Sequence, residues 1–163
     1  MPAEQMVMSR ELMAVLRGAV VYAIQGNHEF VTTADLLLAL MDEEKLGAAL
    51  QEALPRERVI ETQLPDRPPK LAEDDDPTAP FPRYFSLIIR TPDGTDGRWL
   101  DSATYGMFLE GARQVDDGPY LPKHLVKGYI AESTRDYGLM PVLGANSADV
   151  QRMMNRIIDA IPA

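Results

Sequence analysis

The chain has 163 residues, a length that allows one domain or two small helical lobes that share an interface. Since 45% of the residues are hydrophobic, it can form a core. Its formal net charge of −9 disfavours nucleic acids and anionic membranes as partners, since both attract basic patches. The absence of cysteine excludes disulfides and thiolate metal sites, and no apolar run approaches the roughly 18 residues that a membrane span needs.

The first ten residues lack a basic segment followed by an apolar one, so we expect no signal peptide and a cytoplasmic protein. A helix is predicted from Ser9, as its N-cap, to about Gln25, because apolar residues recur at spacings of three and four. They are Leu12, Met13, Leu16, Ala19, Val20 and Ala23. Gly26 and Asn27 tolerate left-handed dihedrals and are predicted to end this helix.

The most informative segment runs from His28 to Met41, where a short polar loop leads into a nearly continuous run of leucines. Thr32 and Thr33 are N-cap candidates, and Asp35 would lie in the first turn, where a carboxylate interacts favourably with the helix dipole. Apolar side chains surround most of the circumference, so the helix is predicted to be buried on several sides. On these residues alone, a core helix of any all-α protein is an equally good interpretation.

Two shorter helices are predicted to complete a first lobe over residues 8–61. Their apolar positions are Leu46, Ala49, Leu50 and Ala53 in one, and Val59 and Ile60, after Pro55, in the other. Residues 62–83 are rich in proline and contain the acidic run from Glu73 to Asp76. This composition predicts an extended, solvated linker, with the acidic run acting as a solubilising surface.

Residues 84–99 are predicted to form a β-hairpin inserted after the linker, with a short helix as the alternative. Tyr84 to Arg90 is rich in aromatic and branched residues, and a strong turn signal over residues 91–94 follows it. Tyr84 and Trp99 are candidates for exposed anchors of a protein interface. The alternative for both is that they cover the junction of the hairpin and the lobe.

The spacing of hydrophobic positions in the first lobe recurs in residues 100–160, shifted by 89 residues. Leu16, Val20 and Ala23 correspond to Tyr105, Leu109 and Ala112; Leu36, Leu37 and Leu40 to Leu125, Val126 and Tyr129; and Leu50 and Leu54 to Leu139 and Leu143. Pro122 suits the first turn of its helix, and Asn146 or Ser147 can cap the last helix. The expected fold class is all-α, with two pseudo-repeated four-helix lobes, a Pro-rich linker and a small hairpin insertion.

The leucine string, the two lobes and the proline-rich break together resemble the tandem-repeat N-terminal domain of the Clp ATPases, over most of residues 8–158. The His28-Glu29-Phe30 form is closest to the ClpA-like members of that family. The resemblance implies an all-α domain that binds adaptors or substrates of an unfoldase and protease system and does no chemistry itself. Its partners would be proteins; the oligomeric state is left open.

The resemblance also implies a partner-binding face in the loop before the leucine helix. The predicted contact residues are His28, Glu29, Phe30, Thr32 and Asp35. Glu29 matches a position that contacts the adaptor ClpS in this family, whereas Ala34 stands where the family has a second acidic residue. Asp35 shifts that carboxylate by one residue, about 100° around the helix. Phe30 would supply apolar contact, and the carboxylates would select a basic or amine-bearing partner.

The motifs of nucleotide and hydrolytic chemistry are missing. No Gly-x-x-x-x-Gly-Lys-Ser/Thr string is present, so we expect no ATP binding, and neither a Gly-x-Ser-x-Gly nor a His-Glu-x-x-His string occurs. We therefore expect no enzymatic activity and no cofactor. A metal site would need His28 and His124 to converge with Glu29 or Asp35; the alternative is that both histidines face water or cap a helix.

Two other functions stay open at this point. One is a free-standing regulator that competes with a Clp ATPase for its adaptors. The other is an unrelated small helical hydrolase or ligand-binding protein, which a pocket with convergent polar groups would favour.

Overall fold

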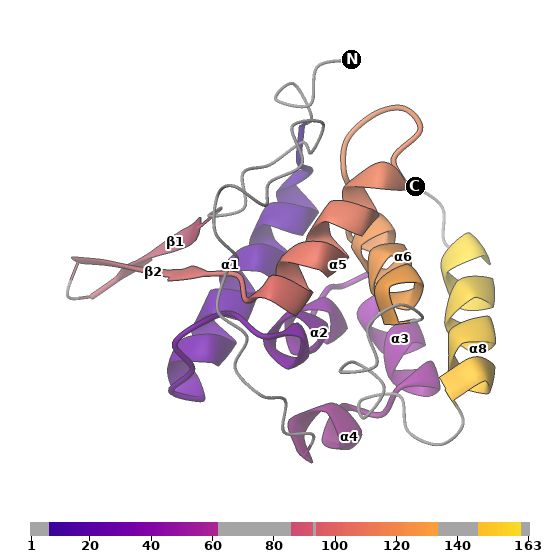
Figure 1. Cartoon of the computed structure of the whole chain (residues 1–163), viewed down its shortest axis with the longest axis horizontal. Coiled ribbons are helices and arrows are strands. Elements are labelled where there is room, and N and C mark those ends of the chain that lie inside the picture. Colours follow the sequence, from indigo (N-terminus) through magenta and orange to yellow (C-terminus); the bar gives the residue numbers. More distant parts are fainter. Residues whose placement is uncertain (1–6, 62–85, 93, 134–146, 161–163) are drawn as a thin grey trace.

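The computed structural model describes residues 7–61, 86–92, 94–133 and 147–160. These ranges form seven helices and one two-stranded antiparallel sheet, so the chain is mostly helical (Figure 1). The predicted linker over residues 62–83 lies outside the described residues, as do Tyr84, Leu139, Leu143 and Asn146. Within the described ranges, no helix combines the length and the apolar character that crossing a membrane requires.

The first two helices begin and end close to where the sequence predicts. Helix α1 spans Arg10–Gln25, and the hydroxyl oxygen of Ser9 accepts a hydrogen bond from the Leu12 N–H at 3.0 Å, which makes Ser9 its N-cap. Asn27 then adopts a φ of 58°, a left-handed conformation that turns the chain away from the helix axis. Helix α2 spans Thr33–Met41, and eight of its residues are buried, which confirms burial on several sides.

Helices α3 (Gly47–Ala53) and α4 (Arg56–Glu61) follow as predicted. The first residue of α4, Arg56, contacts both α1 and the end of α2. The Arg56 guanidinium forms an ion pair with Asp42 at 3.0 Å, bonds to the Tyr22 hydroxyl, and lies 5.6 Å from the centre of the Tyr22 ring. Since Tyr22 belongs to α1 and Asp42 ends α2, one arginine connects three helices.

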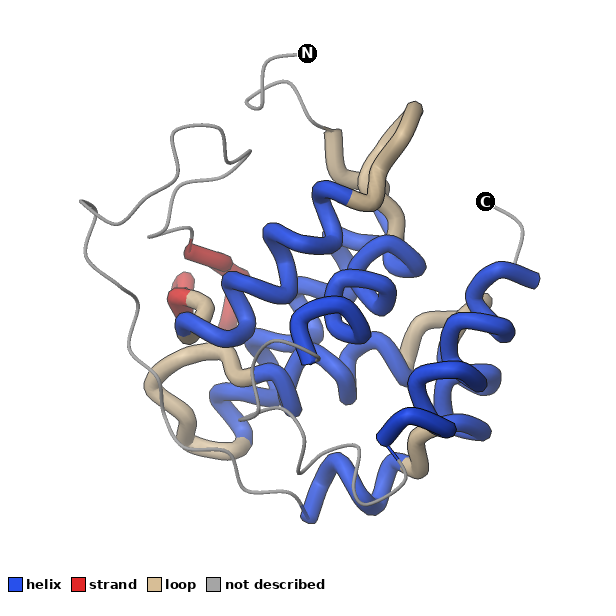
Figure 2. Tube along the Cα trace, turned by 45° about the vertical axis from the view of Figure 1, so that its right-hand side comes forward, coloured by secondary structure: helices blue, strands red, loops and turns tan. Residues whose placement is uncertain are grey.

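The hairpin prediction is confirmed over the helical alternative. Strand β1 (Ser86–Thr91) pairs with β2 (Gly94–Trp99) in antiparallel register, with Ile88 opposite Gly97. The two strands project from one side of the helical body (Figures 1 and 2). Leu87 is buried, whereas Ile88, on the opposite face of the strand, is 65% exposed.

The remaining helices are α5 (Ser102–Arg113), α6 (Pro122–Ser133) and α8 (Ser147–Ala160). Pro122 is the first residue of α6, as predicted. Helices α5 and α6 cross closely at two glycines: a Cβ added to Gly128 would lie 2.4 Å from the Gly111 nitrogen. Helix α8 packs against α6 and α3, and one continuous core joins both halves of the described chain.

Two isolated parallel β-bridges tie the starts of helices together. Met8, two residues before α1, is bridged to Tyr120, two residues before α6. Val31, two residues before α2, is bridged to Leu100, two residues before α5. The starts of α1 and α6 are therefore held side by side, and so are the starts of α2 and α5.

Candidate functional site

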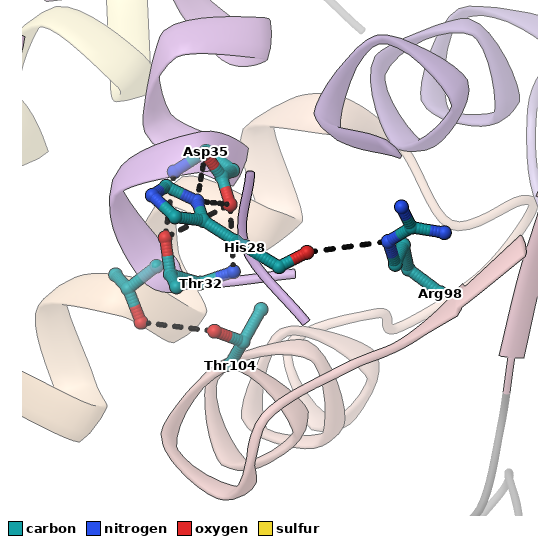
Figure 3. Close-up of polar contacts among 6 residues, drawn as sticks. His28, Thr32, Asp35, Arg98 and Thr104 are labelled. Carbon is teal, nitrogen blue, oxygen red and sulfur yellow. Dashed lines mark hydrogen bonds and ion pairs between the residues drawn. The ribbon is translucent and has the colours of Figure 1, made fainter. Parts of the chain in front are cut away.

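The Asp35 carboxylate is the centre of a buried polar network at the start of α2 (Figure 3). Its Oδ2 accepts hydrogen bonds from the backbone N–H and the hydroxyl of Thr32, both at 3.0 Å. The Thr32 hydroxyl oxygen accepts in return from the Asp35 N–H at 3.2 Å, which completes a capping box. Thr32 is 3% exposed and Asp35 2%, so the network lies beneath the surface.

His28 extends this network to the loop between α1 and α2. Its Nδ1 lies 2.8 Å from Asp35 Oδ2 and 3.1 Å from Oδ1, and its backbone N–H donates to the Ala23 carbonyl at 2.8 Å. Its own carbonyl accepts from Arg98 Nε at 3.2 Å (Figure 3). The ring also lies over Gly26, where an added Cβ would come within 2.9 Å of it. The loop is therefore fixed from three directions.

An open groove of about 650 Å³ separates this loop from the end of β2. The loop wall consists of Asn27, His28, Glu29 and Phe30, and the strand wall of Gly97, Arg98 and Trp99. A backbone hydrogen bond from the Val31 N–H to the Trp99 carbonyl, 2.9 Å long, holds the two walls together at one end. We call this the loop groove. It combines an exposed carboxylate, Glu29, with the side chains of Phe30 and Trp99, the latter 44% exposed.

The structure divides the five predicted contact residues into two groups. Glu29 is exposed, His28 and Phe30 are partly exposed, and all three line the loop groove. Thr32 and Asp35 lie below them in the capping box, with their polar atoms bonded within the chain. We expected Glu29 and Asp35 to present two carboxylates on one face. The structure corrects this expectation, because the Asp35 carboxylate is buried and bonded to His28 and Thr32.

Arg98 and Trp99 belong to the loop groove but not to the predicted loop face. Trp99 was predicted only as a candidate interface anchor, and Arg98 was not predicted as a contact residue. They lie 70 residues away from the loop in the sequence, and only the hairpin brings them beside it. The available signal was the chain's one tryptophan at the end of a predicted strand. Arg98 is ion-paired with Asp96 and donates to the Gly97 carbonyl at 2.9 Å, so its charge is balanced within the hairpin.

The second histidine occupies a different position. His124 is buried near the start of α6, where its Nδ1 accepts a hydrogen bond from the Leu121 N–H at 2.9 Å. Burial lowers the pKa of His124, and the charges of Lys123 and Lys127 lower it further, while Asp116 opposes them. In the part of the chain that the structure describes, no group of three or more acidic or histidine side chains is arranged around a common point for a metal ion.

Comparison with known proteins gives no assignment. No family model matches the chain, and no curated protein matches its sequence.

Proposed function

We propose that the chain is a non-catalytic protein-recognition module of a Clp-type unfoldase and protease system, which binds an adaptor or a substrate protein. The observation that carries this proposal is the loop groove, in which the exposed Glu29 carboxylate lies beside Phe30 and Trp99 on a buried polar support. A groove of this shape suits a protein segment better than a small metabolite, because it is open and does not enclose a small ligand.

The tandem-repeat architecture of the Clp N-terminal domain is supported by contacts that occur in matched pairs. Helix α1 packs on α2 as α5 packs on α6, and α2 packs on α4 as α6 packs on α8. Helix α1 also contacts α6, and α2 likewise contacts α5. The two β-bridges join the same two pairs, one at the starts of α1 and α6 and the other at the starts of α2 and α5. One approximate two-fold axis between residues 8–61 and residues 100–160 would account for all these pairs.

Recognition would depend on one carboxylate and two aromatic side chains. Because Asp96 balances Arg98, the charge of Glu29 is not cancelled across the groove and attracts a basic or amine-bearing group. Phe30 and Trp99 supply apolar contact area, and aromatic anchors of this kind dominate many interfaces. The bonds made by His28 fix the loop before binding, which reduces the entropy lost on association.

The role of the buried network would be to position the loop. Ala34 is only partly buried and carries no charge, and Asp35 points inward, so Glu29 is the acidic contact on this side of the groove. A partner that needs two adjacent carboxylates would bind weakly here. The preferred partner would present one cation next to an apolar side chain.

The proposal is tested by capturing partners from a lysate of the source cell with the purified chain and identifying them by mass spectrometry. Recovery of a Clp unfoldase, its adaptor or tagged substrates is expected. Binding of the recovered adaptor or substrate is then measured for Glu29→Arg and Trp99→Ala, each expected to weaken it about tenfold or more. The matched control is Glu52→Arg, the same charge reversal at an exposed residue of α3.

Asp35→Arg is unsuitable for this test because it would place a cation at a buried position. Unchanged affinity in both Glu29→Arg and Trp99→Ala would rule out the loop groove as the binding site. Recovery of a partner set without any unfoldase, adaptor or degradation substrate would rule out the Clp-type role.

A further inference from the structure

A second groove lies between α1 and the hairpin. Its volume is about 590 Å³, and its lining residues are Arg17, Gly18, Val21, Ile88, Ile89 and Arg90. It shares no lining residue with the loop groove. We call it the edge groove, because three of its residues are consecutive in β1. Successive side chains of a strand point to opposite faces, so a groove that touches all three runs along the edge of the strand.

Among the described residues, the backbone of β1 is paired along one edge only. Strand β2 occupies that edge, and in the described residues no strand pairs with the other one. Such an edge carries N–H and C=O groups that can pair with an extended peptide, and strand addition of this kind is a common mode of peptide recognition. The edge groove therefore offers main-chain hydrogen bonds in addition to side-chain contacts.

Both faces of the strand offer an apolar side chain in this groove. Ile88 is 65% exposed and lies on the outer face, and Val21 of α1 is 40% exposed. Ile89 lies on the inner face with the buried Leu87 and packs partly against the core. A bound strand could bury Ile88 and Val21, which are otherwise large apolar side chains in water.

The charge of the edge groove is opposite to that of the chain as a whole. Arg17 and Arg90 are both exposed, and neither has an ion pair within the described residues. Other arginines are paired: each of Arg56, Arg98, Arg113 and Arg152 contacts a carboxylate. Two guanidinium groups without an ion pair among the described residues lie beside a strand edge that no described strand occupies. In a chain of net charge −9, this arrangement favours an acidic ligand.

We propose that the free edge of β1 binds an extended acidic segment of another protein by strand addition. Carboxylates of that segment would pair with Arg17 and Arg90, and its apolar residues would cover Ile88 and Val21. A second copy of this chain fits less well, because two edge grooves in contact would bring four arginines together. This site does not depend on the function proposed for the loop groove.

The test measures the binding of a defined probe by fluorescence anisotropy. The probe is a labelled octapeptide, Val-Val-Glu-Glu-Val-Val-Glu-Glu, whose extended form presents valine and glutamate alternately on both faces. We expect it to bind about tenfold or more tighter than the same peptide with lysine in place of glutamate, and to weaken as NaCl rises from about 50 to about 500 mM. N-methylation of alternate amides, which removes one edge of donors, should abolish binding.

Variants locate the site. The double variant Arg17→Glu and Arg90→Glu should bind the acidic probe about tenfold or more weakly, and both positions are exposed, so the fold should be kept, as circular dichroism would verify. The control is Arg156→Glu, a charge reversal at an exposed residue of α8, expected to bind as the unaltered chain does. Failure of the acidic probe to bind, equal binding of the lysine peptide, or unchanged binding by the double variant would each overturn the proposal.

Discussion

His124 stands in α6 at the position that Asp35 occupies in α2: each is the third residue of its helix, and each accepts a hydrogen bond from the backbone N–H three residues before it. The distances are 2.9 Å from the Leu121 nitrogen to His124 Nδ1 and 3.0 Å from the Thr32 nitrogen to Asp35 Oδ2. An imidazole in one half thus performs the capping role of a carboxylate in the other. Protonation removes the acceptor nitrogen of the imidazole, whereas a protonated carboxyl group still has an acceptor oxygen.

We expect His124 to make the protein less stable as the pH falls. The ordinary pKa of histidine is 6.5, and burial, together with Lys123 and Lys127, lowers the pKa of His124 in the folded chain. Between these two pKa values the unfolded chain binds more protons, so the free energy of unfolding decreases as the pH drops through 6.5, and the loss is complete below the folded pKa. Urea denaturation at about pH 7.5 and about pH 5.5 measures this decrease.

The control for that prediction is His124→Asn, which keeps an acceptor oxygen but does not titrate. The decrease in unfolding free energy between the two pH values should be smaller in this variant than in the unaltered chain. An equal decrease would show that His124 does not contribute to it.

Asp35→Ala should destabilise the fold, whereas Glu29→Ala should not. Asp35 is buried, and its removal leaves the Thr32 N–H and His28 without their acceptor, which costs about 3 kcal/mol of unfolding free energy. Glu29 is exposed, so its substitution is expected to change stability by less than about 0.5 kcal/mol. Chemical denaturation of both variants checks this; similar losses in the two would contradict the assignment of Asp35 to support and Glu29 to the surface.

Gly128→Ala should be strongly destabilising. The new Cβ would lie 2.4 Å from the Gly111 nitrogen and from the Met107 carbonyl oxygen, so α5 and α6 would have to separate, at a cost of about 3 kcal/mol. The matched control is Gly18→Ala, where the Cβ would meet the Ala39 Cβ at an ordinary 3.4 Å. Since alanine is favoured over glycine in helices by about 1 kcal/mol, this variant should be equal or more stable. Thermal unfolding followed by circular dichroism distinguishes the two outcomes.

Tyr129→Phe should be neutral or stabilising, by up to about 1 kcal/mol. The Tyr129 hydroxyl is buried and, among the described residues, has no hydrogen-bond partner, so its removal relieves an uncompensated desolvation. Tyr120→Phe serves as the comparison, because the Tyr120 hydroxyl donates to the Phe108 carbonyl at 2.6 Å. That variant should lose about 1 to 2 kcal/mol. Urea denaturation measures the free energy of unfolding of both variants. A decrease in both would be inconsistent with the geometry of the two hydroxyls.

Local features of the fold were predictable because they depend on neighbouring residues. Ser9 and Thr32 cap their helices through side chains that reach backbone groups three residues ahead, and Asn27 turns the chain where the apolar period ends. The hairpin followed from branched residues around a Pro-Asp-Gly turn. Glu29 was predicted as a contact residue through a family resemblance, and Phe30 was added to it as an apolar contact. In the structure Glu29 is exposed and Phe30 partly exposed, and their role in binding stays a prediction.

What the sequence determined by itself is the set of helices, the hairpin and the buried leucines of α2, since caps, turns and periodicity act over a few residues. Only the tertiary structure decided that Asp35 is bound by His28 below the surface, that Arg98 and Trp99 form the second wall of the loop groove, and that Arg17 and Arg90 share the edge groove. These contacts join residues that are seven to 73 positions apart. Chain folding sets such distances through packing, and no local pattern encodes them.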